Sequence, residues 1–193
     1  MKNIYLVRHG QTLFNVQHKI QGFCDSPLTE IGIKQAEIAR DHINELGLKF
    51  DSVHASTSER AIDTLKIITD MNFEAHKDLR EWNFGRLEAE GEHLNPPLPY
   101  GDFFVQFGGE DELEIRSRIA RAVKEIADHD DHENILIVSH GAAIAQFIRS
   151  CESTSSIERK GRIQNCSIFR FEYENEVFSL EEIIQHDFSS IEG

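Results

Sequence analysis

Two short apolar runs, far apart in the chain, share one pattern of hydrophobic and polar positions. Residues 4–7 and 135–138 each hold four apolar side chains, and each run leads, after one polar residue, to a His-Gly pair, with His9 in the first and His140 in the second. Unbroken runs of this length are typical of strands buried on both faces of a parallel sheet, where ligands bind beyond the carboxyl ends. The pattern predicts that His9 and His140 meet at one edge of the sheet. The alternative is that both histidines are structural residues of the core. That would not explain why each stands at the same distance along the sequence from its apolar run.

Between and after these runs, the periodicity alternates between that of helices and that of strands. Helical spacing predicts helices over about 29–46, 59–68, 112–128 and from 141 to 148. Further strands are predicted at 50–55 and 73–76, and a hairpin at the sheet edge from 167–171 and 177–180. This order favours an α/β fold, a three-layer sandwich with a mostly parallel central sheet, helices on both faces and a C-terminal edge hairpin. We expect a single domain over residues 1–193, because this length suits one substantial core.

The segment at about 86–111 has neither periodicity. Three of the four prolines of the chain lie within 96–99. Such composition predicts an excursion on the surface, too short to be a separate domain.

Composition restricts the possible partners and the compartment. The formal net charge of −14 argues against nucleic acid or an anionic membrane as a partner. The three cysteines are scattered, so neither a disulfide framework nor a zinc site is predicted, and reduced thiols in the cytoplasm are expected. No apolar stretch has the length of a membrane span or a signal peptide. We therefore expect a cytoplasmic protein.

Arg60 is placed in the first turn of a predicted helix, where a cation opposes the helix dipole. A nearby anion would compensate, and a helix N-terminus itself favours anions. A solvated surface arginine is the alternative. A metal-binding interpretation of the run from His129 to His132 is disfavoured, because its acidic character is more typical of a solvated helix end.

Several short sequence motifs follow one another along the chain, and their order is informative. They are Arg8-His9-Gly10-Gln11-Thr12 with Asn15; Gln21-Gly22 followed by residues 25–32; Ser56 to Ala61 with Thr64; Glu81 with Gly85; and Gly109-Glu110 with Arg116, before Ser139-His140-Gly141. Together they cover nearly the whole chain and resemble the histidine phosphatase superfamily, in the branch similar to cofactor-dependent phosphoglycerate mutase. Gln11 stands where that family more usually has Glu.

The resemblance implies hydrolysis of a phosphomonoester through a phosphohistidine on His9, with Glu81 as general acid and then base. It implies that Arg8 and Arg60 hold the phosphoryl oxygens with paired donors and that His140, if cationic, adds charge. Further substrate-binding residues are then Asn15, Gln21, Gly22 and Gly141. No metal or other cofactor is required, and the expected partner is a small phosphorylated metabolite. The oligomeric state is left open.

Two alternatives remain from the sequence: a phosphoglycerate mutase, and a noncatalytic module that binds a phosphorylated ligand. The retained histidines, arginines and Glu81 argue against the second. Between Arg86 and Arg116 there is no Lys or Arg but eight Asp or Glu, together with several aromatic residues. Acidic repulsion of a second anionic group would favour a phosphatase that accepts apolar or aromatic leaving groups, unless basic residues such as Lys19 or Arg162 fold toward the site.

Overall fold

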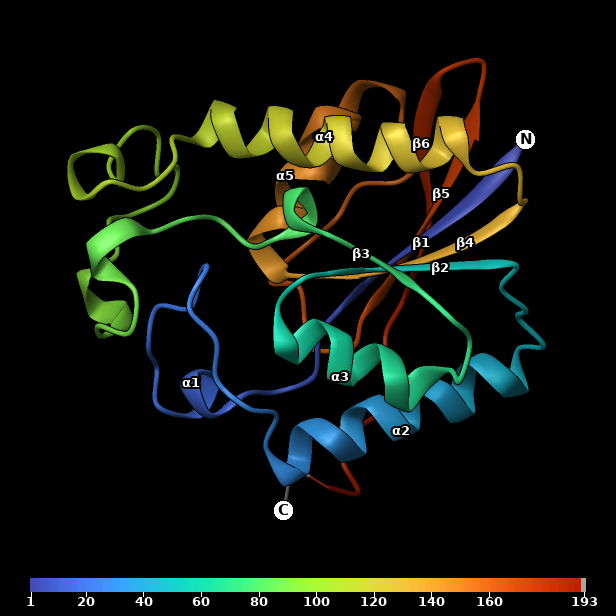
Figure 1. The fold of residues 1–193 in the computed structure, drawn as a ribbon, viewed down its shortest axis with the longest axis horizontal. Coiled ribbons are helices and arrows are strands. Elements are labelled where there is room, and N and C mark those ends of the chain that lie inside the picture. The colour runs from blue at the N-terminus through green and yellow to red at the C-terminus, as the bar shows by residue number, and fades with distance from the viewer. Residues whose placement is uncertain (192–193) are drawn as a thin grey trace.

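The computed structural model describes residues 1–191, and its centre is one six-stranded sheet in the order β3-β2-β4-β1-β5-β6 (Figure 1). The strands are β1 Lys2–Arg8, β2 Ser52–Ser56, β3 Glu74–His76, β4 Asn134–Ser139, β5 Ile168–Glu174 and β6 Val177–Ile184. β1 to β4 are mutually parallel, whereas β5 runs antiparallel to β1 and forms a hairpin with β6. The α/β class, the mostly parallel sheet and the edge hairpin are confirmed.

Helices cover both faces of this sheet, as Figure 1 shows with α4 on one side and α2 and α3 on the other. The helices are α1 Leu13–Val16, α2 Glu30–Glu45, α3 Glu59–Ile68, α4 Glu112–His129 and α5 Gly141–Ser150. Alternate residues of β1 enter different cores, because side chains alternate across a strand. Ile4 and Leu6 pack with α4 and α5, while Tyr5 and Val7 pack with α2 and α3. This two-sided burial explains why β1 contains no polar residue from 4 to 7.

Side-chain caps fix where two of the long helices begin. The Thr29 hydroxyl accepts the Gly32 amide at the start of α2. At the start of α4, Asp111 and Glu114 form a capping box in which each side chain accepts the backbone amide of the other. The short helix α1 was not predicted from the sequence, although Thr12 and Asn15 form a similar box there.

The segment 86–111 contains only short 3₁₀ turns, in keeping with its lack of periodicity. It is nevertheless more than a surface excursion, because Phe104 is fully buried and its ring contacts those of Trp82 and Phe84. Burying a ring of this size stabilises the fold by about 1.5–3 kcal/mol. The segment is therefore anchored in the core beside the loop that carries Glu81. None of the helices within residues 1–191 is long and apolar enough to cross a membrane.

Candidate active site

The carboxyl ends of β1 and β4 bring the two predicted histidines together. The strands pair in parallel with Arg8 opposite Ser139, so the residues that follow them emerge at one edge. The rings of His9 and His140 lie with their centroids 5.3 Å apart, and both side chains are buried. The shared offset in the sequence thus correctly predicted this pair.

His9 is held in one orientation by its own backbone. Its Nδ1 lies 2.7 Å from the carbonyl oxygen of Gly10, which can only accept, so Nδ1 carries the proton in the neutral ring. The lone pair is therefore on Nε2. The Gly10 amide in turn donates to the Thr64 hydroxyl on α3 at 2.9 Å, which fixes the turn that carries His9.

Both imidazoles are neutral at pH 7. Burial, and then the positive charges of Arg60 and Arg8, lower the pKa of His9 well below its ordinary value of 6.5, against an opposing effect of the Gly10 hydrogen bond. Burial, followed by the positive charge of Arg60, lowers the pKa of His140 in the same way. The condition attached to His140, that it adds charge if it is cationic, is therefore not met in this state of the protein.

Arg60 is completely buried, so the alternative of a solvated surface arginine is wrong. Its Nη1 donates to the Cys24 carbonyl at 3.0 Å and to the Asp25 carboxylate at 2.8 Å, and its Nη2 donates to the Gly22 carbonyl at 2.9 Å. Both terminal nitrogens are thus engaged by the loop before α2. Three of the five guanidinium N–H groups are used in this way, so Nε and the second N–H of Nη2 remain as a pair of donors that a phosphoryl group could accept.

Gly22 does not line the cavity that His9 faces. Its contribution to the site is its carbonyl oxygen, which accepts a hydrogen bond from Arg60. A Cβ at this position would lie 2.3 Å from the Trp82 carbonyl oxygen and 2.8 Å from the Phe84 ring. Only glycine lets the loop approach that closely.

Arg8 and Gly141 also meet closely. A Cβ on Gly141 would lie 3.3 Å from Arg8 Nε, so the start of α5 faces that guanidinium. Arg8 Nη1 donates to the Ile163 carbonyl at 2.5 Å. Burial lowers the pKa of Arg8, with Glu81 opposing, but a guanidinium remains charged at neutral pH.

Unpartnered donors concentrate at this place. Among the described residues, five buried side-chain nitrogen or oxygen atoms have no hydrogen-bond partner, and three of them are Arg8 Nε, Arg60 Nε and His140 Nδ1. His140 Nε2 is occupied by the Ser56 hydroxyl at 2.8 Å. Buried donors without acceptors are rare and costly in folded proteins. Two of these donors are charged, so the arrangement fits an anion with several oxygens.

Glu81 lies on the loop after β3 and joins the same end of the molecule. Its Oε2 accepts the Ala142 amide at 2.9 Å, and its Oε1 accepts the amides of Ala143 at 2.7 Å and Trp82 at 2.9 Å. The carboxylate therefore sits against the N-terminus of α5, where the helix dipole favours negative charge. The sequence analysis did not predict this contact with α5.

Asn15 and Gln21 line the cavity, as expected of them. The Asn15 side-chain oxygen accepts the Thr12 amide at 3.1 Å, so its amide nitrogen is the group that it can offer to a ligand. Gln21 bridges the hydroxyls of Thr12 at 2.7 Å and Ser26 at 2.9 Å.

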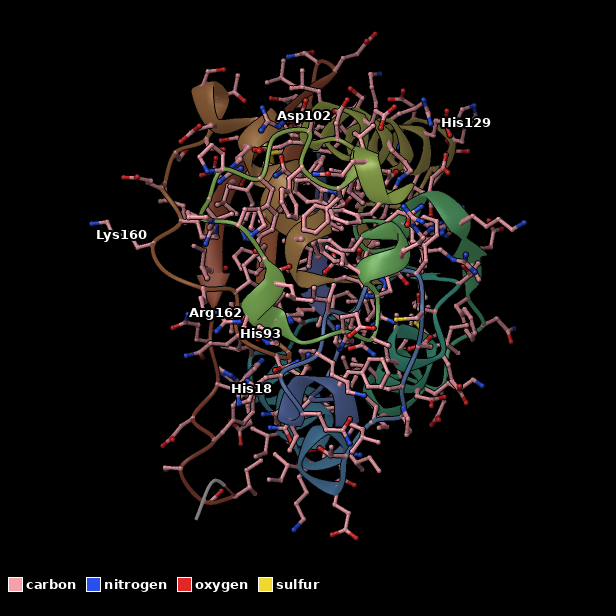
Figure 2. All side chains as sticks on the ribbon, turned by 90° about the vertical axis from the view of Figure 1, so that its left-hand side faces the viewer. His18, His93, Asp102, His129, Lys160 and Arg162 are labelled. Carbon is pink, nitrogen blue, oxygen red and sulfur yellow. The ribbon has the colours of Figure 1, made fainter. Side chains whose placement is uncertain are left out.

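A cavity of about 300 Å³ includes His9, Arg8 and Glu81 in its lining. Arg60 and His140 are not among the lining residues. The rest of its lining includes a set of basic residues, called the basic wall below, made of Lys19, Arg149, Arg159 and Arg162. Trp82, Phe84, Leu98 and Tyr100 also line the cavity, as does the acidic Glu92. Figure 2 looks onto this end of the molecule, with Arg162 on the segment that follows α5.

The basic wall corrects one expectation. Repulsion of a second anionic group is not uncompensated, because Lys19 and Arg162 do fold toward the cavity, and Arg149 and Arg159 join them. Only the first two were named as candidates from the sequence. The cluster Arg159-Lys160-Gly161-Arg162 is visible in the sequence and could have signalled a basic loop.

The neutral state of the two imidazoles can be measured by NMR. A group with a lowered pKa binds its proton only at lower pH, so the ring signals of His9 and His140 are expected to titrate well below pH 6.5, with a histidine peptide as the reference. Assignment uses the His9→Gln and His140→Gln variants. A midpoint at or above that of the peptide for either ring would contradict the electrostatics described here.

Comparison with known proteins agrees with this geometry. The sequence profile of the histidine phosphatase superfamily (branch 1) matches residues 4–185. The chain is 33% identical over 187 residues to a "Probable phosphoglycerate mutase GpmB" of Yersinia pestis (strain Pestoides F), covering 90% of this chain and 86% of the relative.

Two solved structures are similar over nearly their full length. Phosphoglycerate mutase from Bacillus anthracis is 25% identical with a TM-score of 0.82, covering 93% of this chain and 91% of that one. Phosphoserine phosphatase from Entamoeba histolytica, in complex with 3-phosphoglyceric acid, is 26% identical with a TM-score of 0.80, covering 97% and 99%. Because the family profile spans nearly the whole sequence, this chain belongs to branch 1 of the histidine phosphatase superfamily.

Proposed function

We propose that this protein hydrolyses phosphomonoesters through a phosphohistidine on His9. The observation that carries the proposal is the pair of unpartnered buried guanidinium donors, on Arg8 and Arg60, together with the unpartnered Nδ1 of His140, beside an imidazole that is neutral and fixed in one tautomer. A neutral imidazole can act as a nucleophile, and phosphoryl transfer depends mainly on positioning and on stabilisation of the charged oxygens.

In the first step, His9 Nε2 attacks phosphorus and the bond from phosphorus to the leaving oxygen breaks. Glu81, when protonated, gives its proton to that oxygen and becomes a carboxylate. Glu81 must exchange part of its contact with the α5 amides to do so, because both of its oxygens accept hydrogen bonds there.

In the second step, the Glu81 carboxylate takes a proton from water as the water oxygen attacks the phosphohistidine. The phosphorus–nitrogen bond breaks, and His9 returns as a neutral imidazole with inorganic phosphate as the product. The negative charge of the phosphoryl group offsets the guanidinium charges that lower the pKa of His140. Substrate binding therefore favours protonation of His140 and adds a cation when it is needed.

We further propose that the leaving group carries an anion of its own. The basic residues of the lining support this, because Lys19, Arg159 and Arg162 would attract a carboxylate or a second phosphate in a cavity that also holds Glu81 and Glu92, whereas Arg149 is already paired with Glu112. Phosphoserine and 3-phosphoglycerate, the ligands of the Entamoeba histolytica phosphoserine phosphatase structures, are substrates of this class.

Phosphoglycerate mutase activity is the second candidate, since the same basic wall suits a phosphorylated acid and a relative is named for that reaction. A direct assay separates the two. Purified protein is incubated with phosphoserine, with an aryl phosphate, and with 3-phosphoglycerate plus its bisphosphate primer, and both released phosphate and isomerised product are measured. Hydrolysis is expected to dominate. Efficient isomerisation with negligible phosphate release would overturn the proposal.

The acid role of Glu81 predicts a dependence on the leaving group. Glu81→Gln keeps the shape of the side chain but has no proton to give, so phosphorylation should slow least for aryl phosphates, whose leaving oxygens need little protonation. The measurement is the single-turnover phosphorylation rate for a series of esters. An equal loss of rate for good and poor leaving groups would contradict the role of Glu81 as acid.

If the basic wall binds an anion on the leaving group, KM should depend on the charge of that group. Arg162→Ala should raise KM for phosphoserine by about tenfold, the equivalent of roughly one close charge pair, and should leave KM nearly unchanged for an alkyl phosphate whose leaving group carries no charge. Lys160→Ala is the matched control, because Lys160 extends away from the body of the protein and does not line the cavity (Figure 2). Equal changes in KM for the two variants would count against the proposal that the basic wall binds an anion on the leaving group.

A further inference from the structure

A second group of ligand-type side chains lies at the edge of the sheet formed by β2 and β3 (Figure 1). His54 is on β2, opposite Glu74 of β3, and His76 lies two residues further along β3. One imidazole nitrogen of each histidine and one carboxylate oxygen lie within 4.8 Å of one another. The sequence pattern does not reveal this group, because His54 is 20 residues or more from Glu74 and His76 along the chain and meets them only through strand pairing.

The two imidazoles point ring nitrogens at each other. His54 Nδ1 and His76 Nε2 are 3.0 Å apart, and the Glu74 Oε2 is 3.9 Å from the same His76 nitrogen. Two nitrogens bound to one tetrahedral zinc ion at about 2.0–2.1 Å are separated by about 3.3–3.4 Å. The separation of the two nitrogens is therefore within a few tenths of an ångström of that in a zinc site, and the largely exposed Glu74 side chain is free to swing its carboxylate toward an ion.

A buried carboxylate orients His54 from behind. Asp130 Oδ2 lies 3.1 Å from His54 Nε2, and only 8% of the His54 side chain and 11% of the Asp130 side chain are exposed. The carboxylate can only accept, so His54 Nε2 carries the proton and His54 Nδ1 presents its lone pair toward His76. A carboxylate on the far nitrogen is the usual outer partner of a metal-binding histidine.

Asp130 is itself fixed. Its Oδ1 accepts the His132 backbone amide at 3.0 Å and contacts the His132 ring at 2.6 Å. The acidic run at the end of α4, which the sequence analysis considered as a ligand set, thus supports His54 from outside rather than supplying the primary ligands.

The group opens onto a cavity of about 1060 Å³ between β3 and the last turns of α4. Asp51, Asp78, Glu125 and Asp131 also line this cavity, so its field attracts cations. It shares no lining residue with the cavity at His9. Water can therefore occupy the fourth position of an ion held here.

We propose that His54, His76 and Glu74 form a binding site for a divalent transition metal ion of the zinc class, separate from the candidate active site. The ion takes the place of the proton between the two imidazoles, and that proton moves to His76 Nδ1, so both rings bind in the neutral form. Binding ties the edge strand β3 to β2 and stabilises the folded protein by mass action. The inference does not depend on the proposed function.

The test uses tag-free protein that has been stripped with a chelator and then titrated with Zn²⁺ by calorimetry, together with measurement of Tm. One equivalent is expected to bind and to raise Tm. His76→Ala, at the half-buried edge position, should weaken binding at least tenfold. Asp130→Asn, which leaves all three ligands in place, should weaken it by about 10–100-fold.

Two controls assign the binding to this group. His42→Ala disrupts another imidazole pair, His42 Nδ1 and His186 Nδ1 at 2.9 Å, which belongs to no three-ligand group among residues 1–191, and Zn²⁺ binding should be unchanged. His9→Ala should likewise still bind one equivalent of Zn²⁺. The proposal is overturned if the wild-type protein binds no Zn²⁺, if His76→Ala and Asp130→Asn bind as tightly as wild type, or if only His9→Ala loses binding.

Discussion

Two guanidinium groups, on Arg8 and Arg60, are buried beside the imidazole of His9. Their charge determines the protonation of the nearby histidines and the hydrogen bonds that the surrounding loops must supply. Burial and these cations hold the pKa of His9 and of His140 down, so that both rings are neutral. A buried cation is costly unless it is paired or hydrogen-bonded. The loop before α2 supplies carbonyls and the Asp25 carboxylate to Arg60, and Ile163 supplies a carbonyl to Arg8.

The same groups explain how a chain with a net charge of −14 can bind an anionic ligand. Beyond the two buried arginines, four cations from three segments of the chain line the cavity, whereas its acidic members are Glu81 and Glu92. The Glu81 carboxylate is held against the amides of α5. Acidic residues concentrate elsewhere, including around the cavity at β3 and the end of α4.

The sequence predicted those parts of the structure that depend on local pattern. The apolar runs before His9 and His140 identify strands and their common edge, and Thr29 marks the start of α2 correctly. Contacts that depend on tertiary packing could not be predicted in this way. No periodicity indicates that Arg60 is enclosed by residues 22–25, that Phe104 enters the core, or that His54 meets His76 across two strands. The protonation state of His140 was also inaccessible, because it depends on burial.

The central claim is that neutral His9 accepts the phosphoryl group, and trapping of the phosphoenzyme tests it most directly. Protein mixed with an aryl phosphate is quenched in alkali, which preserves phosphohistidine, and the modified peptide is mapped by mass spectrometry. The account predicts acid-labile phosphate on His9 and none in a folded His9→Ala variant, which should also lack turnover. Phosphate on another residue, or undiminished turnover in His9→Ala, would contradict it.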